Sequence, residues 1–176
     1  MSIDPPRLDP SRIDIAFDPQ RQRMVGISAH GLLPFDVPFI SEITDNLWLG
    51  GCEDGLVLPE FIGHLVSLYP WEQYTVEHEL HSRLVVRMYD QTDQAMDQVD
   101  AIASWVNTCR ETAPTLVHCQ AGLNRSSLVA ARALVLGGMT ADAAITMIRE
   151  KRSPACLCNP AFERWLRQPP EPSAFR

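Results

Sequence analysis

The chain has 176 residues, of which 45% are hydrophobic and 21% charged, and this size and composition fit one domain with a full core. Its 15 basic and 22 acidic residues give a formal net charge of −7, which opposes broad charge-driven binding to nucleic acid or to anionic membranes. We therefore expect no nucleic-acid or membrane partner, and any anionic ligand must meet a local cluster of positive groups.

Proline dominates the beginning and the end of the sequence. Six prolines fall within residues 1–38, where each fixes φ and removes a backbone donor, so we expect an extended N-terminal arm there. Three more prolines lie within residues 168–176, which we expect to form a frayed tail. The packed domain is accordingly predicted to span residues 39–167.

Short apolar runs of strand length alternate with helical patterns inside this domain. The runs are rich in Val and Leu and predict strands at 46–49, 64–68, 84–88 and 115–118. Apolar residues with helical spacing predict one helix over 99–109 and a second, buried one over 126–136. Thr140 and Asn159 are predicted to cap two further helices. This order predicts a single-domain α/β fold, with a mostly parallel sheet of about four to five strands flanked by helices.

The most informative segment is His118–Ser127, HCQAGLNRSS, where a strand ends, a turn follows and the buried helix begins. A helix N-terminus offers free N–H groups and the positive end of a dipole, which together bind anions. Arg125 lies close to that end, and its guanidinium can hold two phosphate oxygens. Gly122 permits a positive φ in the turn. The same positive groups favour the thiolate of Cys119, which predicts a nucleophile beside a phosphate-binding loop.

The Cys-x5-Arg spacing alone is weak evidence, because Cys158 and Arg164 have the same separation. We interpret that second pair as a chance match, since Pro160 and an apolar helical pattern leave no glycine cradle around it. The pair Cys119 and Arg125 also has a His directly before the Cys, a Gly three residues after it and a Ser directly after the Arg. With these added, chance predicts about 6 such matches in 100,000 chains.

HCQAGLNRSS resembles the His-Cys-x5-Arg-Ser/Thr signature of the cysteine-dependent protein tyrosine phosphatases, most closely of the small dual-specificity branch. Residues 43–51 and 159–166 resemble that branch's opening strand and closing helix, so the resemblance covers about residues 39–167. It implies a phosphocysteine intermediate on Cys119 and a stabilising hydroxyl on Ser126, with His118 supporting the loop. It also implies a phosphate cradle made of Gln120, Ala121, Gly122, Leu123, Asn124 and Arg125.

This chemistry needs a general acid on a loop after a neighbouring strand. Asp90 follows the predicted strand 84–88 and precedes a polar stretch that leads into a helix. The resemblance implies an acid in this kind of position, and we predict Asp90, with Asp93 and then Asp97 as competitors. All three aspartates could instead be structural, because the helix dipole favours negative charge near a helix N-terminus.

The sequence predicts neither a cofactor nor a structural metal, because the histidines are scattered and no Cys-x2-Cys pair occurs. The other cysteines are expected to be small buried residues, with Cys52 or Cys156 as candidate redox partners of Cys119. The odd number of cysteines and the opening segment, which lacks an apolar run, favour a cytoplasmic protein with reduced thiols. Trp71, Glu72 and Tyr74 either line the cleft or cover the core.

Three classes of function remain open for the site. The loop carries no lysine or second arginine, which favours a single phosphate and hence a phosphorylated protein or peptide substrate. Gly122–Arg125 also resembles the loop of RNA 5′-triphosphatases of the same superfamily, which carry Asn before the Arg. A phosphate-binding module without turnover is the third class, and it is expected to lack the cysteine or the acid. The sequence leaves open the choice between phosphotyrosine and phosphoserine or phosphothreonine, and the oligomeric state.

Overall fold

A five-stranded sheet organises the chain, whose computed structural model describes residues 9–169. The strand order is β4-β5-β8-β6-β7, in which β4 and β5 are antiparallel and every other neighbouring pair is parallel. Three of the four predicted strands are confirmed to within one residue at each end, whereas the strand predicted at 84–88 is found at 82–85, and an edge strand, β4, joins them. The strands are β4 (Ile40–Thr44), β5 (Leu47–Gly50), β6 (His64–Ser67), β7 (Ser82–Val85) and β8 (Thr115–His118).

The two central strands are buried on both faces because their apolar side chains alternate in direction. Val66 and Val117 face a large core shared with the helices. Leu65 and Leu116 belong to a smaller cluster on the loop-covered side, with Leu58, Ile62 and Tyr74. Such double burial explains why β6 and β8 carry Leu and Val at adjacent positions, which point to opposite faces of the sheet.

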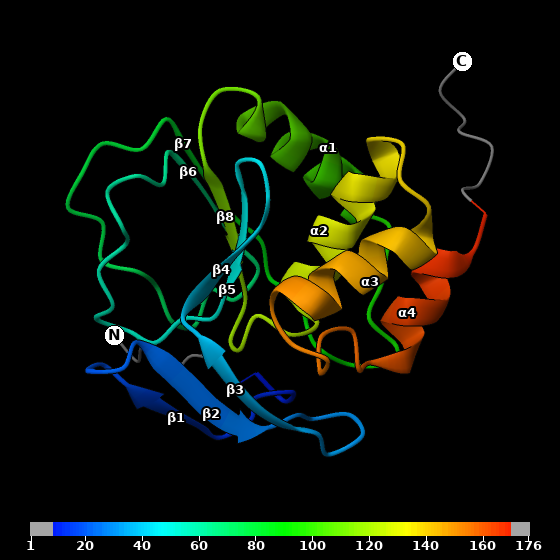
Figure 1. The fold of residues 1–176 in the computed structure, drawn as a ribbon, viewed down its shortest axis with the longest axis horizontal. Coiled ribbons are helices and arrows are strands. Elements are labelled where there is room, and N and C mark those ends of the chain that lie inside the picture. The colour runs from blue at the N-terminus through cyan, green and yellow to red at the C-terminus, as the bar shows by residue number, and fades with distance from the viewer. Residues whose placement is uncertain (1–8, 170–176) are drawn as a thin grey trace, which may run out of the picture.

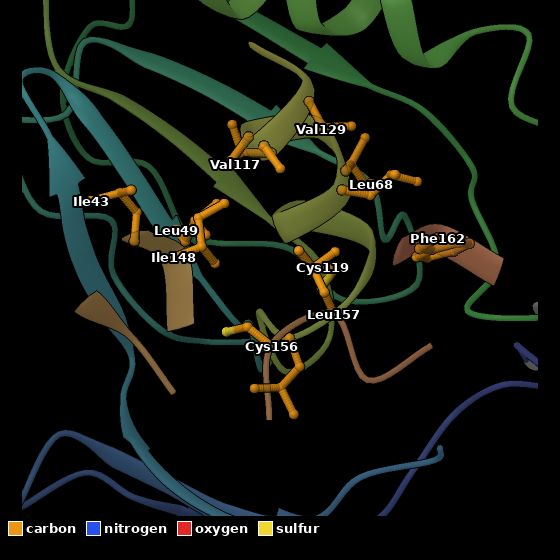
Figure 2. Packing of buried hydrophobic residues seen from close by; sticks show 14 of the residues in the cluster. Ile43, Leu49, Leu68, Val117, Cys119, Val129, Ile148, Cys156, Leu157 and Phe162 are labelled. Carbon is orange, nitrogen blue, oxygen red and sulfur yellow. The ribbon is translucent and has the colours of Figure 1, made fainter. Parts of the chain in front are cut away.

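Four helices gather on one side of this sheet (Figure 1). Helix α2 lies at their centre and is buried from Arg125 to Leu134, as its nearly continuous apolar sequence predicts. Figure 2 shows Val129 of this helix and Cys119 of the preceding loop among the labelled core residues. The helices are α1 (Val99–Arg110), α2 (Arg125–Leu136), α3 (Ala141–Lys151) and α4 (Pro160–Arg167).

The predicted helix ends are confirmed. The Thr140 hydroxyl accepts the backbone N–H of Ala143 at 3.1 Å and caps α3, and the Asn159 side chain accepts that of Ala161 at 3.1 Å and caps α4. Each such cap is worth about 1 kcal/mol. Helix α2 ends at Leu136, as predicted, and Gly137 is its C-cap.

The N-terminal part of the chain differs from the predicted extended arm. Three strands, β1 (Ile15–Asp18), β2 (Arg23–Ile27) and β3 (Pro34–Pro38), form a separate antiparallel sheet. Pro34 and Pro38 are compatible with it because they stand at the two ends of an edge strand, which pairs with β2 alone. The prediction treated proline as a breaker and missed this exception. Residues 1–8 of the predicted arm, and 170–176 of the predicted tail, lie outside the described residues.

Within residues 9–169, no helix is both long enough and apolar enough to cross a membrane.

Candidate active site

The loop between β8 and α2 wraps around the sulfur of Cys119. The backbone N–H of Gly122 donates to Sγ at 3.3 Å, and the hydroxyl of Ser126 lies 3.3 Å from the same atom. Gly122 has φ +70°, as the sequence predicts, and a Cβ there would lie 2.6 Å from the carbonyl carbon of Gly50. Only glycine fits this turn, so the loop can point a backbone amide at the sulfur.

A buried arginine that the sequence analysis missed fixes the shape of this loop. Arg152 donates from Nε to the carbonyl of Gly122 at 2.8 Å and from Nη2 to that of Ala121 at 2.9 Å. Its Nη1 reaches the carbonyl of Pro38 and the hydroxyl of Ser41, both at 3.0 Å. Because the two loop carbonyls are turned toward this guanidinium, the N–H groups of the same turn face the opposite way, toward the pocket.

Arg125 lies at the first position of α2 with its guanidinium buried. Its Nη1 donates to Oδ2 of Asp9 at 2.8 Å and to the carbonyl of Met88 at 3.1 Å. The ring of Tyr69 lies 5.0 Å from the guanidinium carbon, within the range of a cation–π contact. Its Nε is buried and has no hydrogen-bond partner among the described residues. A buried donor without a partner is costly, and an oxyanion would satisfy it.

The N-cap of α2 leaves the end of the helix open to a ligand. Asn124 occupies that position, but its side chain makes no capping hydrogen bond. Its amide donates to Asp90 Oδ2 at 2.9 Å and to the sulfur of Cys158 at 3.2 Å, and its carbonyl accepts the backbone N–H of Asn159 at 2.9 Å. Asn124 therefore ties the loop to its neighbours, and first-turn amides of α2 are left for an anion.

Asp90 lies in the same pocket, whereas Asp93 and Asp97 are exposed and do not line it. The Asp90 carboxylate accepts hydrogen bonds from the amides of Asn124 and Asn159, each at 2.9 Å, and lies 3.1 Å from Nε2 of His30. Burial alone would raise the pKa of Asp90. The hydrogen bonds from His30 and Asn159, with the positive charges of His30 and Arg125, outweigh burial and hold that pKa below its ordinary value.

His118 is completely buried behind the loop. Its Nδ1 lies 3.2 Å from the carbonyl of Cys119, and its ring packs edge-on against Tyr74. Burial lowers the pKa of His118 to about 4, so the ring is neutral at physiological pH. This geometry suits a residue that supports the loop.

The pocket that contains Cys119 is small and is lined by residues from widely separated parts of the chain. Five of the six predicted cradle residues line one wall, together with Cys119 and Asp90, while Gly122 does not. The opposite wall comes from the N-terminal part of the chain, which sequence reasoning had set apart from the site. Its lining residues are Ser11, Ile13, Ser28 and Ala29.

The remaining candidates fall outside this pocket. Tyr74 covers the core, with its hydroxyl donating to the carbonyl of Gly51, and Glu72 pairs with Arg12 at 3.0 Å. Trp71 stacks between Tyr69 and Tyr89. No group of three or more His, Cys, Asp or Glu side chains among residues 9–169 has a metal-binding arrangement.

The other cysteines are free thiols. Burial raises the pKa of both Cys52 and Cys156, which makes either one a poor redox partner for Cys119. Arg164 of the chance match is exposed on α4, so the Cys158–Arg164 pair forms no cradle. Cys158 instead touches Asn124 and supports the true loop.

Comparison with known proteins identifies the class to which this architecture belongs. Residues 62–170 match the family described as "Dual specificity phosphatase, catalytic domain". The chain belongs to this family, as the loop motif implies. The matched segment begins later than the predicted domain, whose boundaries at 39 and 167 stay a prediction. No curated protein matches the sequence.

Solved structures with the same fold are small phosphatases and a phosphatase-like protein. A mouse putative dual specificity phosphatase complexed with zinc tungstate is 20% identical, with TM-score 0.61, over 74% of this chain and 87% of that one. Human DUSP28 is 18% identical, with TM-score 0.63, over 73% and 90%. The human tyrosine phosphatase-like serine/threonine/tyrosine-interacting protein is 20% identical, with TM-score 0.60, over 72% and 92%. At this identity the likeness shows the fold, and the family match supports a phosphatase of this superfamily.

Proposed function

We propose that the chain hydrolyses phosphomonoesters on proteins or peptides through a phosphocysteine intermediate on Cys119. One observation carries the proposal: a single pocket is lined by Cys119, whose sulfur accepts the Gly122 amide, and by a buried arginine, Arg125, whose Nε has no partner within residues 9–169. A nucleophile and a vacant oxyanion donor in one small pocket are the requirements of phosphoryl transfer to sulfur.

In the first step the Cys119 thiolate attacks the phosphorus atom, an S–P bond forms and the bond to the ester oxygen breaks. The loop amides and Arg125 hold the equatorial oxygens, where charge accumulates in the transition state. Asp90 gives its proton to the departing oxygen. In the unliganded site the three donors around Asp90 favour its carboxylate form, but the negative phosphate bound beside it favours the protonated form.

In the second step a water molecule attacks the phosphorus atom, and the S–P bond breaks to release inorganic phosphate and the thiolate. Asp90, now a carboxylate, accepts the proton of that water. The Ser126 hydroxyl, 3.3 Å from Sγ, donates to the thiolate as it leaves. The charge that a metal ion supplies in other phosphatases comes here from Arg125 and the end of α2.

The pocket favours a single phosphate over a polyanion. Among the described residues that line it, Arg125 is the one basic residue, and Asp90 adds a negative charge. The resemblance to RNA 5′-triphosphatases rests on Asn124, but that side chain is committed to Asp90, Asn159 and Cys158. A phosphorylated protein or peptide therefore fits better than an RNA end.

The experiment that tests this proposal compares kcat/KM on a phosphotyrosine peptide, a phosphothreonine peptide and an RNA 5′-triphosphate. Hydrolysis of at least one peptide, at a rate well above that of the RNA, is the expected result. A preference for the RNA would overturn the proposal and identify the chain as an RNA 5′-triphosphatase. Tungstate binding without turnover of any of the three would identify a phosphate-binding module.

Asp90→Asn should lower turnover of esters with poor leaving groups by about a hundredfold, because no proton donor remains. The defect should shrink for aryl phosphates whose leaving groups depart without a proton. The measurement is kcat across an aryl phosphate series, with exposed Asp93→Asn as the matched control. An equal loss for every ester would mean that Asp90 only holds Asn124 and Asn159 in place. A leaving-group dependence in Asp93→Asn alone would move the acid to that position.

His30→Gln should shift the alkaline limb of the kcat/KM pH profile to higher pH. Activity is lost as the pH rises through the pKa of the acid, and His30 helps to hold the pKa of Asp90 down. Removing its charge therefore raises that pKa and extends activity upward. Exposed His81→Gln serves as the control. An unchanged or lowered alkaline limb in His30→Gln would contradict Asp90 as the titrating acid.

A further inference from the structure

The segment before β1 is attached to the active-site loop by several hydrogen bonds. The Gln120 side chain pairs with the backbone of Ile13 in both directions, accepting its N–H at 3.0 Å and donating to its carbonyl at 2.6 Å. The Ser11 hydroxyl accepts the backbone N–H of Asp90 at 2.9 Å. This segment lies outside the family match at 62–170, yet it forms one wall of the pocket.

Asp9 is the charged residue of this segment that reaches the catalytic loop. Its carboxylate is completely buried, with Oδ2 2.8 Å from Nη1 of Arg125. Its Oδ1 accepts the backbone N–H of Ser11 at 2.9 Å and also the Ser11 hydroxyl. Both carboxylate oxygens are therefore bonded, and neither is available to solvent.

Asp9 binds one particular edge of the Arg125 guanidinium, and this choice determines which N–H donors remain for a phosphate. A guanidinium has five N–H donors, and the two on Nη1 are used by Asp9 and the Met88 carbonyl. What remains is the side edge formed by Nε and Nη2, and Nε has no partner. That edge matches two oxygens of a phosphate. Asp9 itself is not among the residues that line the pocket.

We propose that Asp9 is a positioning residue, which holds Arg125 by Nη1 so that the Nε/Nη2 edge is preset to receive the phosphate. The N-terminal segment is then a working part of the active site, because it supplies the carboxylate that orients the phosphate-binding arginine. This inference rests on the proposed function for its substrate, but its physical content is oxyanion affinity. The alternative is that Asp9 mimics a bound phosphate and inhibits the site. Such a carboxylate would bind the Nε/Nη2 edge of Arg125 and block the pocket.

The test uses the full chain with Asp9→Asn and Asp9→Ala. We expect kcat/KM on a small aryl phosphate to fall, and the inhibition constant of orthovanadate to rise, by about ten- to a hundredfold, the scale found for groups that orient active-site ligands. Asp9→Ala should lose more than Asp9→Asn, whose amide oxygen can still accept from Nη1. Asp14→Asn, an exposed acid of the same segment, is the matched control. In an Arg125→Lys background, Asp9→Asn should cause no further loss, because the edge that it orients is gone.

The opposite results overturn the proposal. Faster turnover with tighter vanadate binding in Asp9→Ala would make Asp9 an inhibitory mimic. A lower melting temperature with unchanged oxyanion affinity would make the contact merely structural. Calorimetry on the wild type and on Asp9→Asn compares their affinities for tungstate. This comparison measures the positioning effect without requiring turnover. A failure of the proposed phosphatase activity therefore stays distinguishable from a failure of this inference.

Discussion

Replacing Cys119 by serine should abolish turnover while the protein still binds tungstate. The oxygen of serine is a far poorer nucleophile than a thiolate at neutral pH, so no covalent intermediate forms. The binding groups remain, because Arg152 holds the loop carbonyls and Asp9 holds the Arg125 guanidinium, and neither contact involves the sulfur. The measurements are kcat on an aryl phosphate and tungstate affinity by calorimetry.

Cys109→Ala is the matched control for this variant. Cys109 is a buried cysteine of α1 that does not line the pocket. Cys158 is unsuitable, because its sulfur accepts a hydrogen bond from Asn124. If Cys119→Ser kept more than a few per cent of the wild-type rate, covalent catalysis by this residue would be wrong.

Arg125→Lys should lower kcat/KM by about a hundred- to a thousandfold, the scale measured when a preorganised oxyanion donor is removed. An ammonium is a point charge and cannot offer the two parallel N–H donors of the Nε/Nη2 edge. It also cannot hold Asp9, Met88 and the phosphate together from one planar group. The loss should appear in oxyanion affinity as well as in kcat.

Arg164→Lys is the control, because Arg164 follows Cys158 at the same spacing but lies exposed on α4. Its kinetics should match those of the wild type. A wild-type rate in Arg125→Lys would show that charge alone suffices at this position and would remove the reason for the bidentate geometry.

The elements nearest the reaction could be predicted because their signals are local. The loop motif lies within ten consecutive residues, and the helices around it show one apolar face and standard caps at Thr140 and Asn159. Strands β6 and β8 each have adjacent apolar residues, Leu-Val, at their centres, as sheets covered on both faces require. Local periodicity therefore predicted the fold class, and the ten-residue motif predicted where the candidate site lies.

The parts that were missed depend on contacts between residues far apart in sequence. Asp9 and Arg125 are 116 positions apart, and Arg152 reaches back to Pro38. An arginine that follows an amphipathic helix has the pattern of a surface residue, and nothing local marks Arg152 as the group that turns the loop carbonyls. The N-terminal sheet was missed because β1–β3 are short strands in a proline-rich part of the sequence, and the two prolines of β3 resemble linker sequence.

Asn124 shows a different limit of sequence reasoning. Its place inside the loop suggests a ligand-facing side chain, but its hydrogen bonds run to Asp90, Asn159 and Cys158. A residue type in a motif does not fix the direction of its side chain. The structure therefore weakens the one local feature that favoured an RNA substrate.

Direct trapping of the intermediate tests the central claim. In Ser126→Ala the thiolate that leaves in the second step loses the hydroxyl 3.3 Å away, so the phosphoenzyme should accumulate during turnover of an aryl phosphate. Acid quenching followed by peptide mass spectrometry should find one phosphoryl group on Cys119, and none in Cys119→Ser. Turnover without any phosphoryl group on Cys119, or a phosphoryl group on another residue, would contradict the account.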